Sequence, residues 1–376
     1  MIKLLSKILF KITEYEYSLP LSREEQKLLL FEVDKVNVDE KKLERSYKQY
    51  LAEKNISRKT KFALLNIVSF LLFIPIFLVL LTRYFFLVKG ESQSNISLFK
   101  NLPIILEKKY EPLVINKPFG AIDICLFLKA LNNCLKVTLS PYFILRIIWK
   151  LSIYKQIVLE HQPKVIIISG EMNFESSFLT YFCNDLGIEH INIMHGEKYY
   201  FIKDSYSYFN SFYVWDEYYI NLFKSLNGHA DNFFVYNIME RYFNCDKNEF
   251  SNILKYYSQI SSSFGEFKER VSNLMNYANE NNLDLVIRFH PSHIKKQEVE
   301  YVKKLNINVE SSVVSLLESL LESKIICAES STVLTQAFAL GFPVVVDNTS
   351  ITNYNRLKNL GLYILTQKHE LLVKNT

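Results

Sequence analysis

One stretch of the chain decides the fold class, and it reads KIICAESSTVLTQAFALGFPVVVD from Lys324 to Asp347. The short apolar run from Ile325 to Ala328 is typical of a buried strand. A helix is predicted to begin at the hydroxyl residues Ser330 to Thr332 and to end at Gly341-Phe-Pro343. A second apolar run, Val344 to Val346, follows. This strand–helix–strand pattern predicts a parallel sheet of the α/β class.

The start of that helix has the chemistry of a phosphate site. Free backbone N–H groups, hydroxyl donors and the positive end of the helix dipole all favour an anion. Ser330, Ser331 and Thr332 are therefore candidate donor-binding residues, and Glu329 could accept a hydrogen bond from a ribose hydroxyl. The simpler interpretation is that one serine only caps the helix and that Glu329 is a surface carboxylate.

A second strand end upstream points to the same chemistry. The predicted strand Leu285 to Phe289 carries Arg288 and is followed by His290 and Pro291. Ligands of open parallel sheets bind beyond the carboxyl ends of the strands. A cation and an imidazole there can stabilise the charge of a departing nucleotide. We expect Arg288, His290 and Pro291 to bind the donor, with His290 also catalytic. The alternative is that Pro291 only directs the chain out of the strand.

The N-terminal half repeats this arrangement. One predicted strand, Val165 to Ile168, is followed by Glu171, and the next, Ile188 to Met194, is followed by His195. Because the two strands should be neighbours, we expect Glu171 and His195 to lie close together. A transferase needs a base that takes the proton of the acceptor hydroxyl. Both residues are catalytic candidates, and the sequence leaves the choice open.

Three further residues are weaker candidates. Glu175 and Glu197 are reserve carboxylates, and Glu197 is also expected on the acceptor side together with Trp215. Three of the candidates in this half also have ordinary structural interpretations. Glu171 would cap the following helix, His195 would belong to a strand-ending turn, and Trp215 would pack in the core.

The length of 376 residues and the 49% hydrophobic content allow two domains and an appendage. The predicted fold class is α/β, with two Rossmann-like domains facing a cleft and a helical, partly membrane-associated N-terminal region. That region spans 1–110 and includes the apolar segment 62–88. An acceptor domain is expected over 111–250 and a donor-nucleotide domain over 251–376. The pattern from Ser251 to Asn281 predicts one long amphipathic helix.

The apolar segment suggests contact with a membrane. Phe62 to Thr82 holds no charged residue and has the length of one membrane span. Pro75 interrupts it and cationic residues flank both ends, so monotopic or hairpin insertion is favoured over a crossing. The expected location is the cytoplasmic face of the bacterial inner membrane. The alternative is a buried helix of a large core.

Composition and missing motifs exclude several classes of protein. The five cysteines are scattered and odd in number, which favours reduced thiols, and no secretory signal is visible. The net charge of +5 comes without zinc-type spacing or an RNA motif, so no nucleic-acid partner is expected. Dinucleotide, P-loop and G-x-S-x-G motifs are absent. We predict no cofactor and, without an Asp-x-Asp motif, no metal.

Several short motifs occur in an order that resembles a known group of enzymes. They are Ile168-Ser-Gly-Glu171, Ile193-Met-His-Gly196, Tyr213-Val-Trp215, Arg288-Phe-His-Pro291, Glu329-Ser-Ser-Thr332, Gln336-Ala337 and Gly341-Phe-Pro343, between Pro163 and the C-terminus. They resemble the GT-B glycosyltransferases of bacterial surface-polysaccharide synthesis, and among these the His-Pro-motif group. That group includes sialyl- and polysialyltransferases, Kdo transferases of capsule assembly and glycerophosphotransferases of teichoic acid synthesis.

The resemblance implies specific roles. It assigns the phosphate of a cytidine nucleotide to His290 and to Ser330 to Thr332, and it assigns proton abstraction to Glu171 or His195. Two positions depart from the group's pattern. Ser169-Gly170-Glu171 replaces paired acids before a glycine, and no Gly-x-Pro turn follows Trp215.

The sequence therefore predicts a metal-independent glycosyltransferase of capsule or lipopolysaccharide synthesis. Its expected partners are a nucleotide-sugar donor, with a CMP-sugar as one candidate, a glycan or lipid-linked glycan acceptor, and a membrane surface. Three alternatives stay open: a polyol-phosphate transferase of the CDP-glycerol type, a nucleotide-sugar epimerase, and a non-catalytic membrane-tethered scaffold.

Overall fold

The computed structural model of the chain describes residues 21–57, 59–87, 90, 93–117, 119–240, 252–259, 263–290 and 294–373. The chain divides into two compact units. The N-terminal unit extends to His195 and resumes from Phe201 to Tyr236. The C-terminal unit consists of Gly196–Tyr200 and the chain from Asn237 onward. The predicted domain boundary at residue 250 lies outside the described residues.

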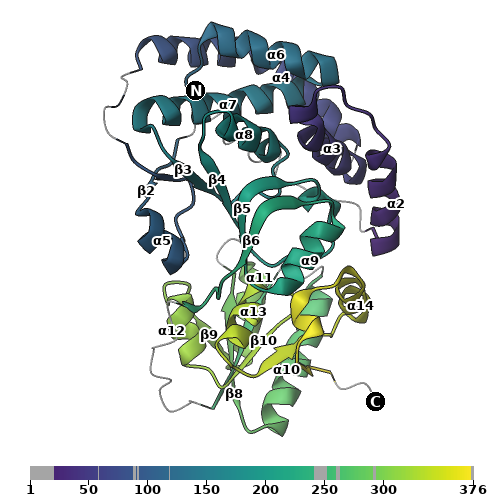
Figure 1. The fold of residues 1–376 in the computed structure, drawn as a ribbon. Helices are drawn as coiled ribbons and strands as arrows, with labels where there is room; N and C mark the ends of the chain where they lie inside the picture. Colours follow the sequence, from purple (N-terminus) through teal and green to yellow (C-terminus); the bar gives the residue numbers. More distant parts are fainter. Residues whose placement is uncertain are drawn as a thin grey trace. The chain divides into compact units, whose positions relative to one another are not determined.

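A parallel sheet of six strands forms the centre of the N-terminal unit, in the order β2-β1-β3-β4-β5-β6 (Figure 1). The strands are β1 (Ile96–Ser97), β2 (Leu113–Val114), β3 (Val165–Ile168), β4 (Glu189–Ile193), β5 (Tyr208–Val214) and β6 (His229–Val235). The predicted strand at β3 is confirmed residue for residue, and all four of its side chains are buried. A parallel sheet covered on both faces requires such continuous apolar strands.

Helices surround this sheet and include the whole described N-terminal region. They are α2 (Arg23–Asp34), α3 (Lys41–Ile56), α4 (Lys59–Phe85), α5 (Ile104–Tyr110), α6 (Ile124–Val137), α7 (Pro141–His161), α8 (Glu175–Asn184) and α9 (Glu217–Ser225), with the 3-10 turn η1 (Ile202–Asp204). The helix α3 packs on α8, and α4 packs on α7. The helical region expected over 1–110 is thus part of the N-terminal unit.

The helix α4 is 27 residues long and continues through Pro75. Within the described part of the chain, it is the helix long and apolar enough to cross a membrane, and 22% of its most apolar window is buried. The alternative of a fully buried core helix is therefore wrong.

The C-terminal unit contains a second parallel sheet of six strands, in the order β12-β11-β10-β7-β8-β9. The strands are β7 (Ile253–Ser258), β8 (Asp284–Phe289), β9 (Asn308–Glu310), β10 (Ile325–Ala328), β11 (Val344–Val346) and β12 (Glu370–Leu371). The other elements are α10 (Phe264–Glu280), α11 (Lys296–Lys304), α12 (Leu316–Leu321), α13 (Thr332–Ala339), α14 (Ile351–Leu360) and the 3-10 turn η3 (Tyr363–Thr366). The two sheets with their helices fit the predicted two-domain α/β fold of the GT-B type.

The predicted long helix from Ser251 to Asn281 is wrong in its first part. Ile253–Ser258 form β7, which lies between β10 and β8, and the helix α10 begins only at Phe264. The side chain of Lys255 is 1% exposed on this strand. A lysine in an apolar run is typical of a half-exposed helix. In the structure, the charge of Lys255 is instead neutralised inside the C-terminal unit.

Side chains of the C-terminal sheet alternate between two separate cores. Leu254 and Cys327 belong to the core on one face, while Tyr257 and Ile326 belong to the core on the other. The helix α13 ends before Gly341, whose φ of 77° favours glycine. The predicted end of this helix is thus confirmed.

Candidate functional site

In the C-terminal unit, the two predicted donor-binding segments lie at one edge of one sheet. His290 follows β8, and Ser330 to Thr332 follow β10. Only β7 separates these parallel strands, so the two segments are about 10 Å apart at the strand ends. Gln259, just past β7, lies next to the second segment because its Oε1 accepts a hydrogen bond from Ser330 Oγ at 2.9 Å.

The three hydroxyl residues have separate partners. Ser331 is the N-cap of α13, and its side chain accepts a hydrogen bond from the Val333 N–H at 3.3 Å. This agrees with the capping interpretation for one serine. Thr332 Oγ1 accepts from the Glu197 N–H at 3.2 Å. The hydroxyls of Ser330 and Thr332 therefore serve contacts beyond the cap, and phosphate binding by the segment stays a prediction.

Glu197 belongs to the C-terminal unit, and its predicted place on the acceptor side stays a prediction. Gly196–Tyr200 belongs to the C-terminal unit, and the Glu197 carboxylate accepts a hydrogen bond from Thr335 Oγ1 in α13. The Tyr200 N–H also donates to the Leu360 carbonyl of this unit, at 2.7 Å. Glu197 thus supports the helix that carries the predicted donor site.

Glu329 is buried, so the interpretation as a surface carboxylate is wrong. Its side chain accepts a hydrogen bond from Asn353 Nδ2 at 2.6 Å, and its Oε2 lies 3.5 Å from Arg270 Nη2. Burial raises the pKa of Glu329, although Arg270 and Asn353 oppose the shift. Its predicted contact with a ribose hydroxyl remains a prediction.

Arg270 is the centre of a buried charge cluster that sequence reasoning missed. Its side chain is 0% exposed, and its Nε lies 2.5 Å from Asp347 Oδ2. Its Nη2 donates to Glu266 Oε1 at 2.9 Å. Tyr256 also donates to Asp347, at 2.9 Å. One sequence signal was present, because Glu266 and Arg270 stand four residues apart on α10, a spacing that brings side chains together.

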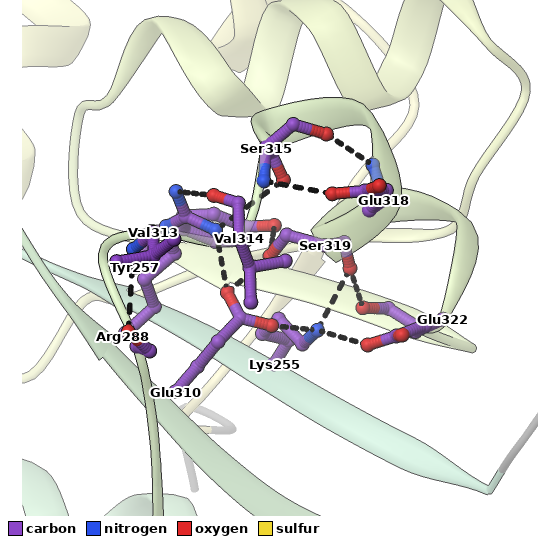
Figure 2. A network of polar contacts seen from close by, with 12 residues as sticks. Lys255, Tyr257, Arg288, Glu310, Val313, Val314, Ser315, Glu318, Ser319 and Glu322 are labelled. Carbon is purple, nitrogen blue, oxygen red and sulfur yellow. Dashed lines mark hydrogen bonds and ion pairs between the residues drawn. The ribbon is translucent and has the colours of Figure 1, made fainter.

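Arg288 is held within a second network, which Figure 2 shows from close by. Its Nη1 donates to Glu310 Oε2 at 2.6 Å, and its Nη2 donates to the Val314 carbonyl at 2.8 Å. The other Glu310 oxygen accepts from Lys255 Nζ at 2.5 Å. A direct bond from Arg288 to a phosphate would have to replace one of these contacts. Donor binding by Arg288 therefore stays a prediction.

The Glu310→Gln variant is expected to lose roughly 3 kcal/mol of free energy of unfolding near neutral pH, because it leaves a buried lysine without its carboxylate. Burial opposes ionisation of Glu310, but hydrogen bonds from Lys255, Ser319 and Arg288 outweigh it and hold its pKa below the ordinary 4.5. A lowered pKa adds stability above 4.5 that is lost as the pH falls through the folded value. Urea denaturation should therefore show a large difference between variant and wild type at neutral pH and a smaller one in acid.

Glu322 gives the matched control for this experiment. Its carboxylate lies 3.7 Å from the same Lys255 Nζ but is 64% exposed. Glu322→Gln should change the free energy of unfolding by less than about 0.5 kcal/mol. Equal losses for the two variants would contradict the role given to Glu310.

His290 is exposed immediately after β8. Pro291 lies outside the described residues, so its predicted donor contact has no structural account. Among the described residues, no group of three or more His, Cys, Asp or Glu side chains is placed to hold a metal ion.

In the N-terminal unit, the expected proximity of Glu171 and His195 is confirmed. The His195 N–H donates to Glu171 Oε1 at 3.1 Å, and Asn192 Nδ2 donates to Glu171 Oε2 at 3.1 Å. Glu171 is 1% exposed, whereas the His195 side chain is exposed and its ring meets Phe99 edge-on. Glu171 therefore positions the turn after β4, and the imidazole of His195 is the more accessible of the two side chains. The role of either residue as a proton acceptor stays a prediction.

Glu175 and Trp215 have mainly structural contacts. Arg146 Nη2 lies 2.5 Å from Glu175 Oε1 in an ion pair whose carboxylate is buried. Trp215 donates its indole N–H to Tyr236 Oη at 2.9 Å and meets Tyr219 edge-on. Burial raises the pKa of Tyr236, partly offset by the bond from Trp215. These contacts agree with the packing interpretation, and an acceptor role for Trp215 stays a prediction.

A cavity of about 210 Å³, which no sequence motif indicated, opens at the carboxyl edge of this sheet. Its wall includes Leu98 and Gly170, which directly precede Phe99 and Glu171 in the chain. Lys150 also lines it and makes no hydrogen bond or ion pair with any described residue. Burial lowers the pKa of Lys150, partly offset by Glu175. The cavity thus includes the residue before Glu171 in its wall, together with a lysine that has no ion-pair partner in the described part of the chain.

Comparison with known proteins gives only distant likenesses. No protein-family model matches the chain, and no curated protein matches it. Among solved structures, S. aureus TarM in complex with UDP is 13% identical, with a TM-score of 0.34 over 49% of this chain and 41% of that one. The wall teichoic acid polymerase TagF is 11% identical, with a TM-score of 0.36 over 54% of this chain and 57% of that one. The chain thus spans about half the length of these two proteins.

A third solved structure is matched more fully. UDP-N-acetylglucosamine 2-epimerase from Rickettsia bellii is 13% identical, with a TM-score of 0.40 over 64% of this chain and 72% of that one. Such low scores and identities assign no activity to this chain. The α/β fold class is carried by the strand order of the two sheets.

Proposed function

We propose that the chain is a glycosyltransferase that moves a sugar from a nucleotide-activated donor to a growing surface glycan. The carrying observation is the shared strand edge in the C-terminal unit, where His290 follows one strand and Ser330 to Thr332 follow another. Parallel sheets bind ligands at this edge, and a helix start with hydroxyl groups suits the phosphates of a nucleotide.

In the proposed reaction, the carboxyl edge of the sheet in each unit has one role. In the N-terminal unit, His195 takes the proton of the acceptor hydroxyl, and Glu171 holds the turn that carries His195. The acceptor oxygen then bonds to the anomeric carbon of the donor sugar, and the bond from that carbon to the phosphate oxygen breaks. In the C-terminal unit, His290 and the start of α13 stabilise the negative charge on the leaving nucleotide.

A more specific part of the proposal concerns the identity of the acceptor and of the donor. We place a glycan or lipid-linked glycan acceptor in the cavity beside Lys150, because hydroxyl-rich ligands need several polar partners in a concave site. A CMP-sugar donor and a product in capsule or lipopolysaccharide synthesis follow from the motif resemblance alone.

Nucleotide binding gives the first test. One of CMP, CDP, UDP and GDP is expected to raise the melting temperature of the wild type, because a ligand that binds only the folded state stabilises it by about 2.7 kcal/mol at a concentration of 100 Kd. His290→Ala should lose most of this shift while melting like the wild type without ligand. His369→Ala is the matched control, because His369 precedes β12 and therefore lies at the amino ends of the strands of the same sheet. This variant should keep the full shift in melting temperature.

The products then separate the rival activities. A new glycosidic bond on an added acceptor supports the proposal. A phosphodiester product would identify a polyol-phosphate transferase, and conversion of the donor sugar without an acceptor would identify an epimerase. If none of the four nucleotides changes the melting temperature, a non-catalytic scaffold becomes the better account.

A further inference from the structure

The solvent-facing side of α4 is entirely apolar in its central part. Its large side chains are 47% to 70% exposed and lie at helical spacing, namely Leu64, Ile67, Phe70, Leu71, Ile74 and Leu78. The opposite side of the helix is buried in the N-terminal unit. Soluble proteins rarely leave such a continuous apolar face in water, so this face requires a partner.

The neighbouring helix α6 extends this surface. Phe127 of α6 stacks on Phe77 of α4, with ring centroids 3.9 Å apart, so the two helices are in contact (Figure 1). Along α6, Ile124, Leu128 and Leu135 are 52%, 55% and 47% exposed. We call these nine exposed apolar residues of α4 and α6 the α4–α6 face.

The charges on the two helices of this face have one sign. Neither α4 nor α6 contains an aspartate or glutamate, while Lys129 and Lys136 on α6 are exposed. Lys59 lies at the start of α4 and is also exposed. Exposed apolar side chains next to cations complement a bilayer with anionic headgroups, where the apolar groups enter the interface and the lysines remain among the phosphates.

The contacts of α4 within the N-terminal unit limit the orientation that this helix can take in a bilayer. Near its start, Asn66 Oδ1 accepts from Ser140 Oγ at 2.7 Å, and near its end Arg83 Nε donates to the Gly120 carbonyl at 3.1 Å. Between these points α4 packs along α7. A helix that crossed the bilayer would have to abandon these contacts or carry the unit's core into the lipid. An orientation parallel to the surface keeps them all.

We propose that the α4–α6 face binds flat on the surface of a bilayer that contains anionic lipid, with α4 lying in the interface and not across it. This inference does not rest on the proposed glycosyl transfer. It adds α6 to the membrane contact and makes phosphatidylglycerol or a similar anionic lipid a requirement for tight binding.

Flotation of the full chain with vesicles tests the surface. Wild type should float with vesicles of phosphatidylcholine and phosphatidylglycerol and bind pure phosphatidylcholine at least about tenfold more weakly, because several lysines contribute near an anionic surface. Phe70→Asp with Ile74→Asp should reduce binding to the anionic vesicles by more than about 100-fold, since two large apolar groups are replaced by anions. Val313→Asp is the control, because Val313 is 90% exposed in the C-terminal unit and should bind like wild type.

The lysines are tested separately. Lys129→Glu with Lys136→Glu should remove most of the preference for phosphatidylglycerol while leaving the weaker binding to phosphatidylcholine nearly unchanged. Unchanged melting temperatures would show that all these exposed substitutions leave the fold intact.

Orientation is read from single cysteines placed near the two ends of α4. Thr60→Cys and Thr82→Cys, each in a background with Cys125→Ser and Cys245→Ser that keeps only the buried Cys134, Cys183 and Cys327, should both react with a membrane-impermeant maleimide added outside sealed vesicles. Protection of one end only would show a crossing and overturn the proposal. Wild type that does not float, or a dimer in solution that Phe70→Asp with Ile74→Asp abolishes, would also overturn it, the dimer by making a second copy the occupant of the face.

Discussion

The His195→Ala variant is expected to transfer sugar roughly 100- to 10,000-fold more slowly than wild type, the range that a general base contributes. The exposed imidazole follows β4, while the His195 backbone N–H is held by the buried Glu171 carboxylate at 3.1 Å. Alanine keeps this backbone bond, so the turn should stay in place and the loss should fall on kcat more than on KM.

Two further variants sharpen this test. Glu171→Gln keeps an oxygen for the His195 N–H, so a positioning role predicts a smaller loss of rate than that of His195→Ala. His229→Ala is the matched control, because His229 is also exposed in the N-terminal unit, at the start of β6 and away from the carboxyl edge. A rate for His195→Ala within twofold of wild type, together with a large loss for Glu171→Gln, would transfer the catalytic role to Glu171.

Replacement of Arg270 by leucine should have the largest effect on stability. The guanidinium is fully buried and meets Asp347, Glu266 and Glu329 at 2.5, 2.9 and 3.5 Å. Removing it leaves buried carboxylates without a counter-charge, which costs about 3–5 kcal/mol of free energy of unfolding. Urea denaturation followed by circular dichroism measures this loss. Lys268→Leu removes an exposed cation from the same helix and should change stability by less than about 0.5 kcal/mol.

The same variant has an expected pH dependence. Burial raises the pKa of Glu329 above the ordinary 4.5 even with Arg270 present. For this group, the free energy of unfolding is highest below 4.5 and falls as the pH rises through the raised value. Without Arg270 the carboxylates should take up protons more readily, so the deficit of Arg270→Leu should shrink on acidification. A deficit that is constant with pH would show that lost packing, and not unpaired charge, causes the destabilisation.

Continuous apolar runs made much of the fold predictable. The strands at Val165–Ile168, Ile325–Ala328 and Val344–Val346 occupy the predicted residues, because a strand covered on both faces leaves no alternative to apolar side chains. The strand β7 was missed because its buried Lys255 is neutralised by Glu310, 55 residues away in sequence. A pattern read over a local window does not contain that partner.

Part of the candidate site was also predictable from the sequence, namely which strand ends lie close together. Strand ends brought Glu171 next to His195 and placed His290 and Ser330 at one edge, because parallel strands share the edge at which they end. The sequence did not show that Glu171 is buried and His195 exposed, because burial depends on the whole unit. The hydrogen-bond and ion-pair partners of Arg288 and Glu329 could not be predicted from local sequence either, because they lie in other parts of the chain.

The five residues from Gly196 to Tyr200 limit how this protein can be divided into fragments. They are separated by 36 residues from the rest of the C-terminal unit, yet Lys198 and Tyr200 are 4% and 1% exposed. A fragment that starts at Asn237 would lack Glu197 beside Thr332 and Thr335. Recombinant dissection or the exchange of nucleotide-binding halves between proteins must therefore graft this pentapeptide as well.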